Sequence, residues 1–141
     1  MNNNRYKILF VEDEENIRTF VSALLEANGY QTILAGSYKE GKTMYFSYVP
    51  DLVILDLGLP DEDGSKLLSD VRKSDTTPFI VLSARSDEAE KVRLLDLGAN
   101  DFVTKPFGSA ELLARVRSIL RNSRHSSETG RLPGGKFTLC D

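Results

Sequence analysis

The sequence contains one cysteine, one histidine and no tryptophan, and it has no apolar run long enough to cross a membrane. A single cysteine, Cys140, cannot form an internal disulfide, and one histidine with one cysteine offers no zinc cluster. The first residues, MNNNRYK, lack the apolar core of a signal peptide. These absences favour a protein of the reducing cytoplasm with no direct membrane insertion.

A strong excess of charge of one sign is also lacking. Lysine and arginine total 18 residues against 21 aspartates and glutamates, for a formal net charge of -3. The chain therefore has no broad positive field with which to hold nucleic acid. Its 141 residues, of which 40% are hydrophobic, suffice for one compact domain but not for two.

What the sequence does contain is a regular alternation of short apolar runs and amphipathic segments. Apolar runs bounded by turn formers predict strands, at 8–11, 32–35, 52–56, 79–82 and 102–104. Apolar positions at helical spacing, with capping residues at the ends, predict helices. These extend from Asn16 to before Gly29, from Ser37 to before Pro50, from Ser65 to Ser74, from Asp87 to Leu97, and from Ser109 to about Leu120.

The order is strand then helix, five times over. Such alternation predicts an α/β doubly wound parallel sheet with helices on both faces. A flavodoxin-like five-stranded sheet with strand order 2-1-3-4-5 is the expected arrangement. In that order the first, third, fourth and fifth strands are neighbours, so the residues at their carboxyl ends converge at one edge.

The residues predicted to converge there are Glu12, Asp13, Asp56, Ser83 and Lys105. Three carboxylates at one edge repel one another unless a cation is bound among them. Their hard oxygen ligands favour Mg²⁺, which accepts one or two carboxylates together with a phosphate oxygen. An oxygen nucleophile, a lysine and a hydroxyl complete the requirements of phosphoryl transfer, with Asp56 as the nucleophile.

Each of these residues also has an ordinary structural explanation. Glu12 and Asp13 could stabilise the start of the first helix through its dipole. Asp56 could be a loop or cap residue, and Ser83 and Lys105 could be loop residues in contact with solvent. Their conjunction at four strand ends favours phosphoryl transfer.

The chain from Lys7 to Asn122 resembles the receiver domain of two-component response regulators, which has a CheY-like version of the fold predicted above. The resemblance implies that Asp56 is the phosphoacceptor and that Ser83 is the family's hydroxyl residue. It also implies that Lys105 is the invariant lysine and that a cis proline, Pro106, follows it. The magnesium ligands that it implies are Glu12, Asp13, Asp56 and the backbone carbonyl of Gly58.

The resemblance implies a signalling switch rather than a turnover enzyme. A sensor histidine kinase would donate the phosphoryl group to Asp56, after which Ser83 moves toward it and Phe102 turns inward. The surface of the fourth helix, fifth strand and fifth helix would then form a symmetric homodimer. Charged residues of that surface, which could also be merely solvated, are Lys91, Asp96, Asp101, Glu111 and Arg115, with Lys91–Glu111 and Asp101–Arg115 as the expected pairs between subunits.

The expected domain boundaries follow from a change in composition after Asn122. Residues 1–122 form the receiver domain, the polar stretch 123–135 reads as a linker, and 136–141 alternates like a strand that begins a second domain. KPFGSAELLARVR resembles the OmpR/PhoB subfamily, whose second domain is a DNA-binding winged helix. DLGLPDEDG and LSARS further resemble regulators of potassium-transport genes.

Two other functional classes remain open. One is a receiver-like interaction module that does not take phosphate. The other is an aspartate-nucleophile phosphatase, although such enzymes place a second aspartate two residues after the first, where this chain has Gly58.

Overall fold

The computed structural model describes residues 6–85 and 87–130. In this part of the chain five strands and five helices alternate, as the sequence pattern predicts. The strands are β1 (Lys7–Val11), β2 (Gln31–Ala35), β3 (Leu52–Asp56), β4 (Phe79–Ser83) and β5 (Asp101–Thr104). The helices are α1 (Glu15–Ala27), α2 (Tyr38–Tyr48), α3 (Ser65–Arg72), α4 (Glu88–Leu97) and α5 (Ser109–Gly130).

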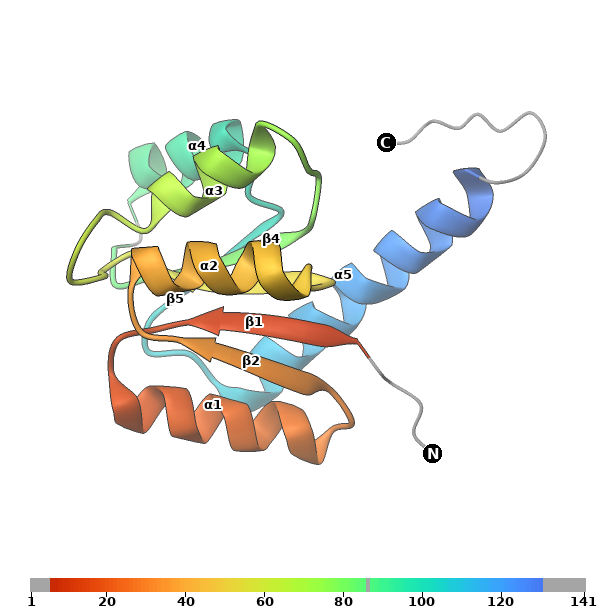
Figure 1. Ribbon diagram of the computed structural model, residues 1–141, viewed down its shortest axis with the longest axis horizontal. Helices are drawn as coiled ribbons and strands as arrows, with labels where there is room; N and C mark the ends of the chain where they lie inside the picture. The colour runs from red at the N-terminus through yellow and green to blue at the C-terminus, as the bar shows by residue number, and fades with distance from the viewer. Residues whose placement is uncertain (1–5, 86, 131–141) are drawn as a thin grey trace.

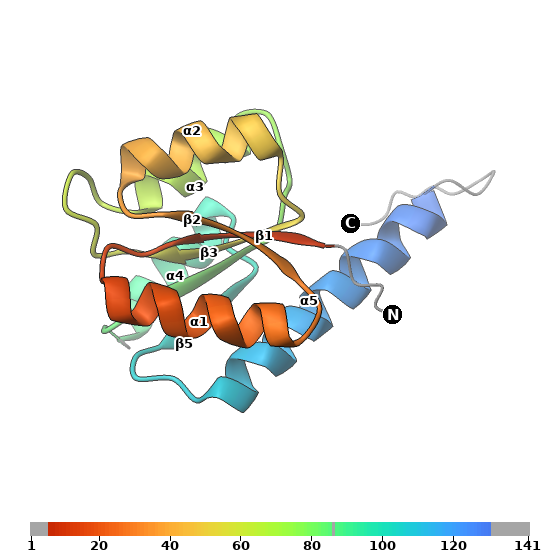
Figure 2. The same cartoon turned by 60° about the horizontal axis from the view of Figure 1, so that its bottom comes forward.

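All neighbouring strands are parallel, and their order is β2-β1-β3-β4-β5, which confirms the predicted topology. Figures 1 and 2 show α1 and α5 on one face of the sheet and α2, α3 and α4 on the other. Because side chains alternate between the faces of a strand, β1 contributes to two separate cores. Ile8 and Phe10 pack on the α1 and α5 side, and Leu9 and Val11 pack on the opposite side.

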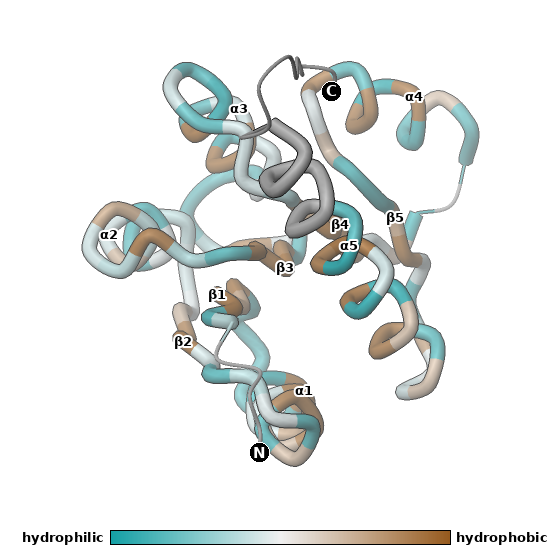
Figure 3. Tube along the Cα trace, turned by 90° about the vertical axis from the view of Figure 1, so that its right-hand side faces the viewer, coloured by the Kyte–Doolittle hydropathy of each residue, from teal (hydrophilic) through white to brown (hydrophobic). Residues whose placement is uncertain are grey.

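The three inner strands are apolar on both faces because helices cover both faces. Every residue of β3 and β4 is buried, and Figure 3 shows the brown apolar positions of the strands enclosed between the helices. Asp56, the last residue of β3, is therefore held in place by a strand that is packed on both faces.

Residues that the sequence predicts as caps lie at the starts and ends of three helices. Ser37 and Asp87 accept hydrogen bonds from the backbone N–H groups of Glu40 and Glu90 at the starts of α2 and α4. Gly29 and Gly98 follow α1 and α4 with φ angles of 91° and 113°, a conformation that glycine adopts without steric cost.

The last helix is longer than predicted. It continues to Gly130, so that residues 123–130 of the predicted linker are helical. No glycine or proline interrupts the chain between Ser109 and Glu128, so the backbone has no strong stop. Figures 1 and 2 show that this end of α5 extends beyond the sheet. The predicted strand at 136–141 lies outside the described residues.

One apolar position of α1 is also on the outside. Phe20, which the helical pattern groups with Val21 and Leu25, is 53% exposed, whereas those two residues are fully buried. Among the described residues no helix is both long and apolar enough to span a membrane.

Candidate functional site

The carboxyl ends of β1, β3, β4 and β5 meet at one edge of the sheet and form a pocket of about 610 Å³. Glu12 and Asp13 follow β1, Asp56 and Ser83 are the last residues of β3 and β4, and Lys105 follows β5. All five line the pocket, so the structure brings together every residue that the sequence predicts for this edge.

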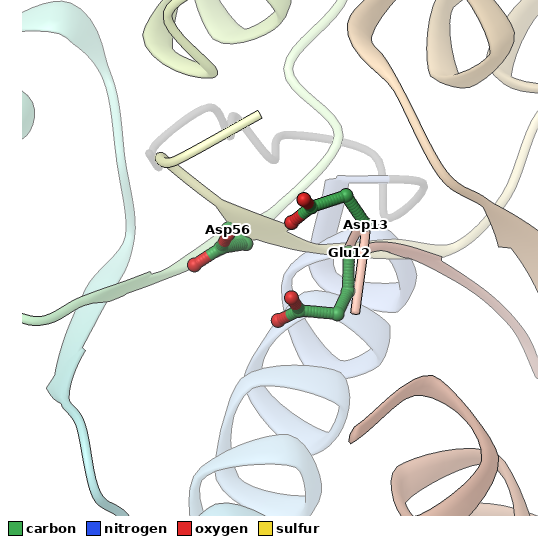
Figure 4. A group of neighbouring side chains, drawn as sticks. All are labelled: Glu12, Asp13 and Asp56. Carbon is green, nitrogen blue, oxygen red and sulfur yellow. The ribbon is translucent and has the colours of Figure 1, made fainter. Parts of the chain in front are cut away.

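The side chains of the three acids lie close together at the ends of β1 and β3 (Figure 4). One carboxylate oxygen from each of Glu12, Asp13 and Asp56 lies within 4.8 Å of the others. Glu12 and Asp56 are only 1% and 3% exposed, while Asp13 is exposed. The carboxylates of Glu12 and Asp56 are thus buried in the protein, and that of Asp13 lies on the solvent side of the group.

Lys105 provides the counter-charge to the buried acids. Its Nζ lies 2.6 Å from Asp56 Oδ1 and 3.5 Å from Glu12 Oε1. Burial by itself lowers the pKa of Lys105, but its hydrogen bond to Asp56 and the charges of Asp56 and Glu12 outweigh burial, so the pKa is raised. Lys105 therefore carries its proton at neutral pH.

The pocket remains short of positive charge. Burial raises the pKa of Glu12, and the charge of Asp56 raises it further, although a hydrogen bond from the Glu14 backbone lowers it. The donor set of three carboxylates beside one ammonium group fits a small divalent cation that prefers oxygen ligands, such as Mg²⁺.

The loop after β3 forms the outer wall of the pocket. Gly58 and Asp63 pair as an antiparallel bridge, and Asp61 accepts hydrogen bonds from the backbone N–H groups of Tyr38 and Lys39 at the start of α2. The sequence places Gly58 two residues after Asp56, but it does not predict the contacts of Asp61, since they join segments far apart in the chain.

Ser83 and Phe102 lie in different surroundings. Ser83 is buried in the pocket wall, where its Oγ accepts a hydrogen bond from the Arg85 backbone. Phe102 is half-buried against the core beneath α4, and Lys91 Nζ lies 5.7 Å from the centre of its ring. The peptide bond between Lys105 and Pro106 is cis, as the family resemblance implies.

The charged residues expected at a dimer interface lie on α4, β5 and α5. Within a single chain, Arg115 already contacts Asp101 at 2.8 Å and Glu111 at 3.2 Å. The pair Asp101–Arg115, expected between subunits, is thus made inside one subunit in this structure. The sequence cannot distinguish these two pairings, since both use the same residues.

A model of the response regulator receiver domain family matches residues 8–117, most of the chain. The chain belongs to this family. Receiver domains of response regulators are signalling switches that bind Mg²⁺ at an acidic pocket, and in this receiver domain Glu12, Asp13 and Asp56 form a group of acids.

Two curated relatives of this receiver domain are transcriptional regulatory proteins. It is 47% identical to the KDP operon transcriptional regulatory protein KdpE of Escherichia coli over 131 residues, which are 93% of this chain and 57% of that protein. It is 44% identical to KdpE of Mycobacterium tuberculosis, over 86% of this chain and 54% of that protein. The chain spans about half the length of these relatives.

Solved structures show the same fold. The receiver domain of the Francisella response regulator 1452 aligns with a TM-score of 0.81 and 32% identity, covering 84% of this chain and 99% of that one. The BeF3-activated receiver domain of Klebsiella pneumoniae RstA aligns with a TM-score of 0.78 and 32% identity, covering 82% and 98%.

Proposed function

We propose that this receiver domain accepts a phosphoryl group on Asp56 from a sensor histidine kinase. The observation that carries the proposal is the contact of Lys105 Nζ with Asp56 at 2.6 Å inside a pocket with two further carboxylates. A lysine held there can pair with an oxygen of the incoming phosphoryl group, whose negative charge would otherwise be repelled.

In the proposed transfer, a carboxylate oxygen of Asp56 attacks the phosphorus of a phosphohistidine. The bond between phosphorus and the donor nitrogen breaks, and its electron pair stays on that nitrogen. Lys105 pairs with a phosphoryl oxygen, and the hydroxyl of Ser83 turns to donate to another. Burial of Asp56 at the end of β3 holds the nucleophile in place and limits access of water to the acyl phosphate.

Glu12, Asp13, Asp56 and the backbone carbonyl of Gly58 would hold Mg²⁺, in agreement with the oxygen donors that face the pocket. When bound, the ion supplies the positive charge that offsets the charge developing on the phosphoryl oxygens.

An apolar groove of about 620 Å³ beside the pocket supports a protein as the phosphoryl donor. Ile17, Phe20 and Phe107 line it, and Lys105 and Ala84 belong to both the groove and the pocket. A donor that packs on the exposed ring of Phe20 would lie next to Asp56.

Acetyl phosphate with Mg²⁺ tests the acceptor role without a kinase. We expect a mass gain of one phosphoryl group in the wild type, none in Asp56→Asn, and an unchanged gain in Asp96→Asn, which removes an exposed acid outside the pocket. Intact-protein mass spectrometry checks this. No gain in the wild type would instead support an interaction module without phosphate, and rapid release of phosphate would support a phosphatase.

We further propose that phosphorylation moves Ser83 and Phe102 and so reshapes the face formed by α4, β5 and α5, which then dimerises. Val92 and Leu95 on α4 are 48% and 50% exposed and offer apolar area for the contact. A two-fold contact would exchange the Asp101–Arg115 pair inside a chain for pairs between chains, alongside Lys91–Glu111 and Asp96. Such an exchange adds little affinity but sets the register.

Beryllofluoride, a mimic of the phosphoryl group, tests dimerisation. We expect sedimentation velocity to show a shift from monomer to dimer when beryllofluoride and Mg²⁺ are added to the wild type. Leu95→Ser should stay monomeric because it removes apolar contact area, whereas Leu34→Ser, a similar change at the exposed edge strand β2, should dimerise. An identical monomer fraction with and without the mimic would contradict the proposal.

We propose that the output is control of transcription in the cytoplasm, carried by a DNA-binding domain that follows the linker rather than by these residues. Two facts support this division: the similar KdpE proteins are transcriptional regulatory proteins, and this chain spans only about half of their length. The similarity to KdpE proteins supports potassium-transport genes as the target.

A further inference from the structure

A chain of hydrogen bonds joins α4 to the start of α3 along the rim of the pocket. Glu90, in the first turn of α4, is only 7% exposed. Arg93 donates from Nε to Glu90 Oε1 at 3.2 Å and from Nη2 to Glu90 Oε2 at 3.1 Å. The remaining nitrogen, Nη1, donates to Ser65 Oγ at 3.3 Å. One guanidinium group therefore connects the two helices.

The chain continues from Ser65 to the loop that carries Gly58. The backbone N–H and the hydroxyl of Ser65 both donate to Asp63 Oδ1, at 2.8 Å and 2.7 Å. Asp63 in turn pairs with Gly58 in the antiparallel bridge. Asp63, Gly58, Glu90 and Arg93 all line the pocket around Asp56.

We infer that Arg93 is a positioning residue for the magnesium site, held in its orientation by Glu90. A backbone carbonyl has no side-chain torsion of its own, so the position of the Gly58 carbonyl depends on how firmly the loop is held. Arg93 holds that loop through Ser65 and Asp63, as outer-shell partners orient the ligands of a metal. The inference rests on the proposed role of Gly58 in binding Mg²⁺.

The charge of Arg93 has an effect opposite to its positioning role. A positive charge on the wall of the pocket disfavours a second cation, so simply deleting Arg93 would mix two opposing effects. Arg93→Lys keeps the charge but cannot reproduce the planar fork that contacts Glu90 and Ser65 together. Ser65→Ala breaks the same chain without any change of charge.

The test is a titration of ¹⁵N-labelled protein with MgCl₂, in which amide chemical shifts of the pocket give the dissociation constant. We expect Arg93→Lys and Ser65→Ala each to raise the Mg²⁺ dissociation constant about three- to tenfold. The double variant should bind Mg²⁺ no more weakly than the weaker-binding single variant, because both changes interrupt the same chain of hydrogen bonds. The Gly58 amide should also shift in the variants before any Mg²⁺ is added.

Arg115→Lys is the matched control. Arg115 likewise contacts two acids, Asp101 and Glu111, but it lies outside the pocket. The Arg115→Lys variant should therefore bind Mg²⁺ with the same dissociation constant as the wild type. Thermal melts establish that each variant is folded, and if Ser65→Ala does not fold, the more exposed Arg93→Lys decides alone.

Unchanged Mg²⁺ affinity in Arg93→Lys, beside a wild type that binds normally, would overturn the inference and leave the proposed function standing. Additive losses in the double variant would also overturn it. A wild type that binds no Mg²⁺ would overturn the proposed function itself, and the inference with it.

Discussion

Replacing Lys105 with methionine is expected to destabilise the metal-free protein by about 2–3 kcal/mol at neutral pH. Lys105 Nζ contacts both Asp56 and Glu12, whose carboxylates are almost fully buried. Removing one partner of a buried ion pair leaves the other charge without compensation, which is far more costly than losing an exposed pair. Methionine has a similar length and no charge, so the loss reflects electrostatics more than packing.

The same variant should respond more strongly to Mg²⁺ than the wild type does. With no ammonium group among the acids, a divalent cation becomes the main counter-charge, so binding tightens and the free energy of unfolding recovers as Mg²⁺ is added. Phosphorylation by acetyl phosphate should nevertheless slow by about 10²-fold, because the cation that pairs with the phosphoryl oxygen is missing.

Urea unfolding with and without MgCl₂ measures both effects. Lys91→Met is the control, since Lys91 is exposed on α4 outside the pocket and its loss should change stability by no more than about 0.5 kcal/mol. Equal stability of Lys105→Met and the wild type without Mg²⁺ would contradict the role of Lys105 as the counter-charge.

Replacing Gly64 with alanine is expected to destabilise the protein by about 3 kcal/mol and to impair phosphorylation of Asp56. A Cβ at Gly64 would collide with the backbone carbonyl oxygen of Asp56 and lie 2.9 Å from Leu57 Cα. These are backbone atoms of the segment that carries Asp56, the proposed phosphoacceptor, so they cannot rotate away. The φ of Gly64 is -57°, which any residue adopts, so glycine is required for space alone.

Chemical denaturation and acetyl phosphate labelling of Gly64→Ala measure the two consequences. Gly108→Ala is the matched control because a Cβ at Gly108 would have nothing within 4 Å. We expect its stability to remain within about 0.5 kcal/mol of the wild type. If both alanine variants behaved alike, the close approach of Gly64 to Asp56 would not constrain the pocket.

The elements and their order were predictable because each depends on neighbours in the chain. Strand β3 is an apolar run that ends at Asp56. Ser37 and Asp87 start α2 and α4 through local hydrogen bonds, and Gly98 ends α4 through its backbone conformation. The end of α5 was not predictable in this way. Its polar residues after Asn122 suit a solvated helix as well as a linker, and local composition does not distinguish the two.

Local sequence pattern is sufficient to group Glu12, Asp13, Asp56, Ser83 and Lys105, since parallel strands carry their carboxyl ends to a common edge whatever the details of packing. The local sequence pattern does not predict contacts between residues of separate helices and strands. The link from Arg93 to Ser65, the pairing of Arg115 with Asp101 inside one chain and the exposure of Phe20 depend on how helices pack against the sheet. The spacing and orientation of helices follow from the shape of the whole core, so these features exist only in the folded protein.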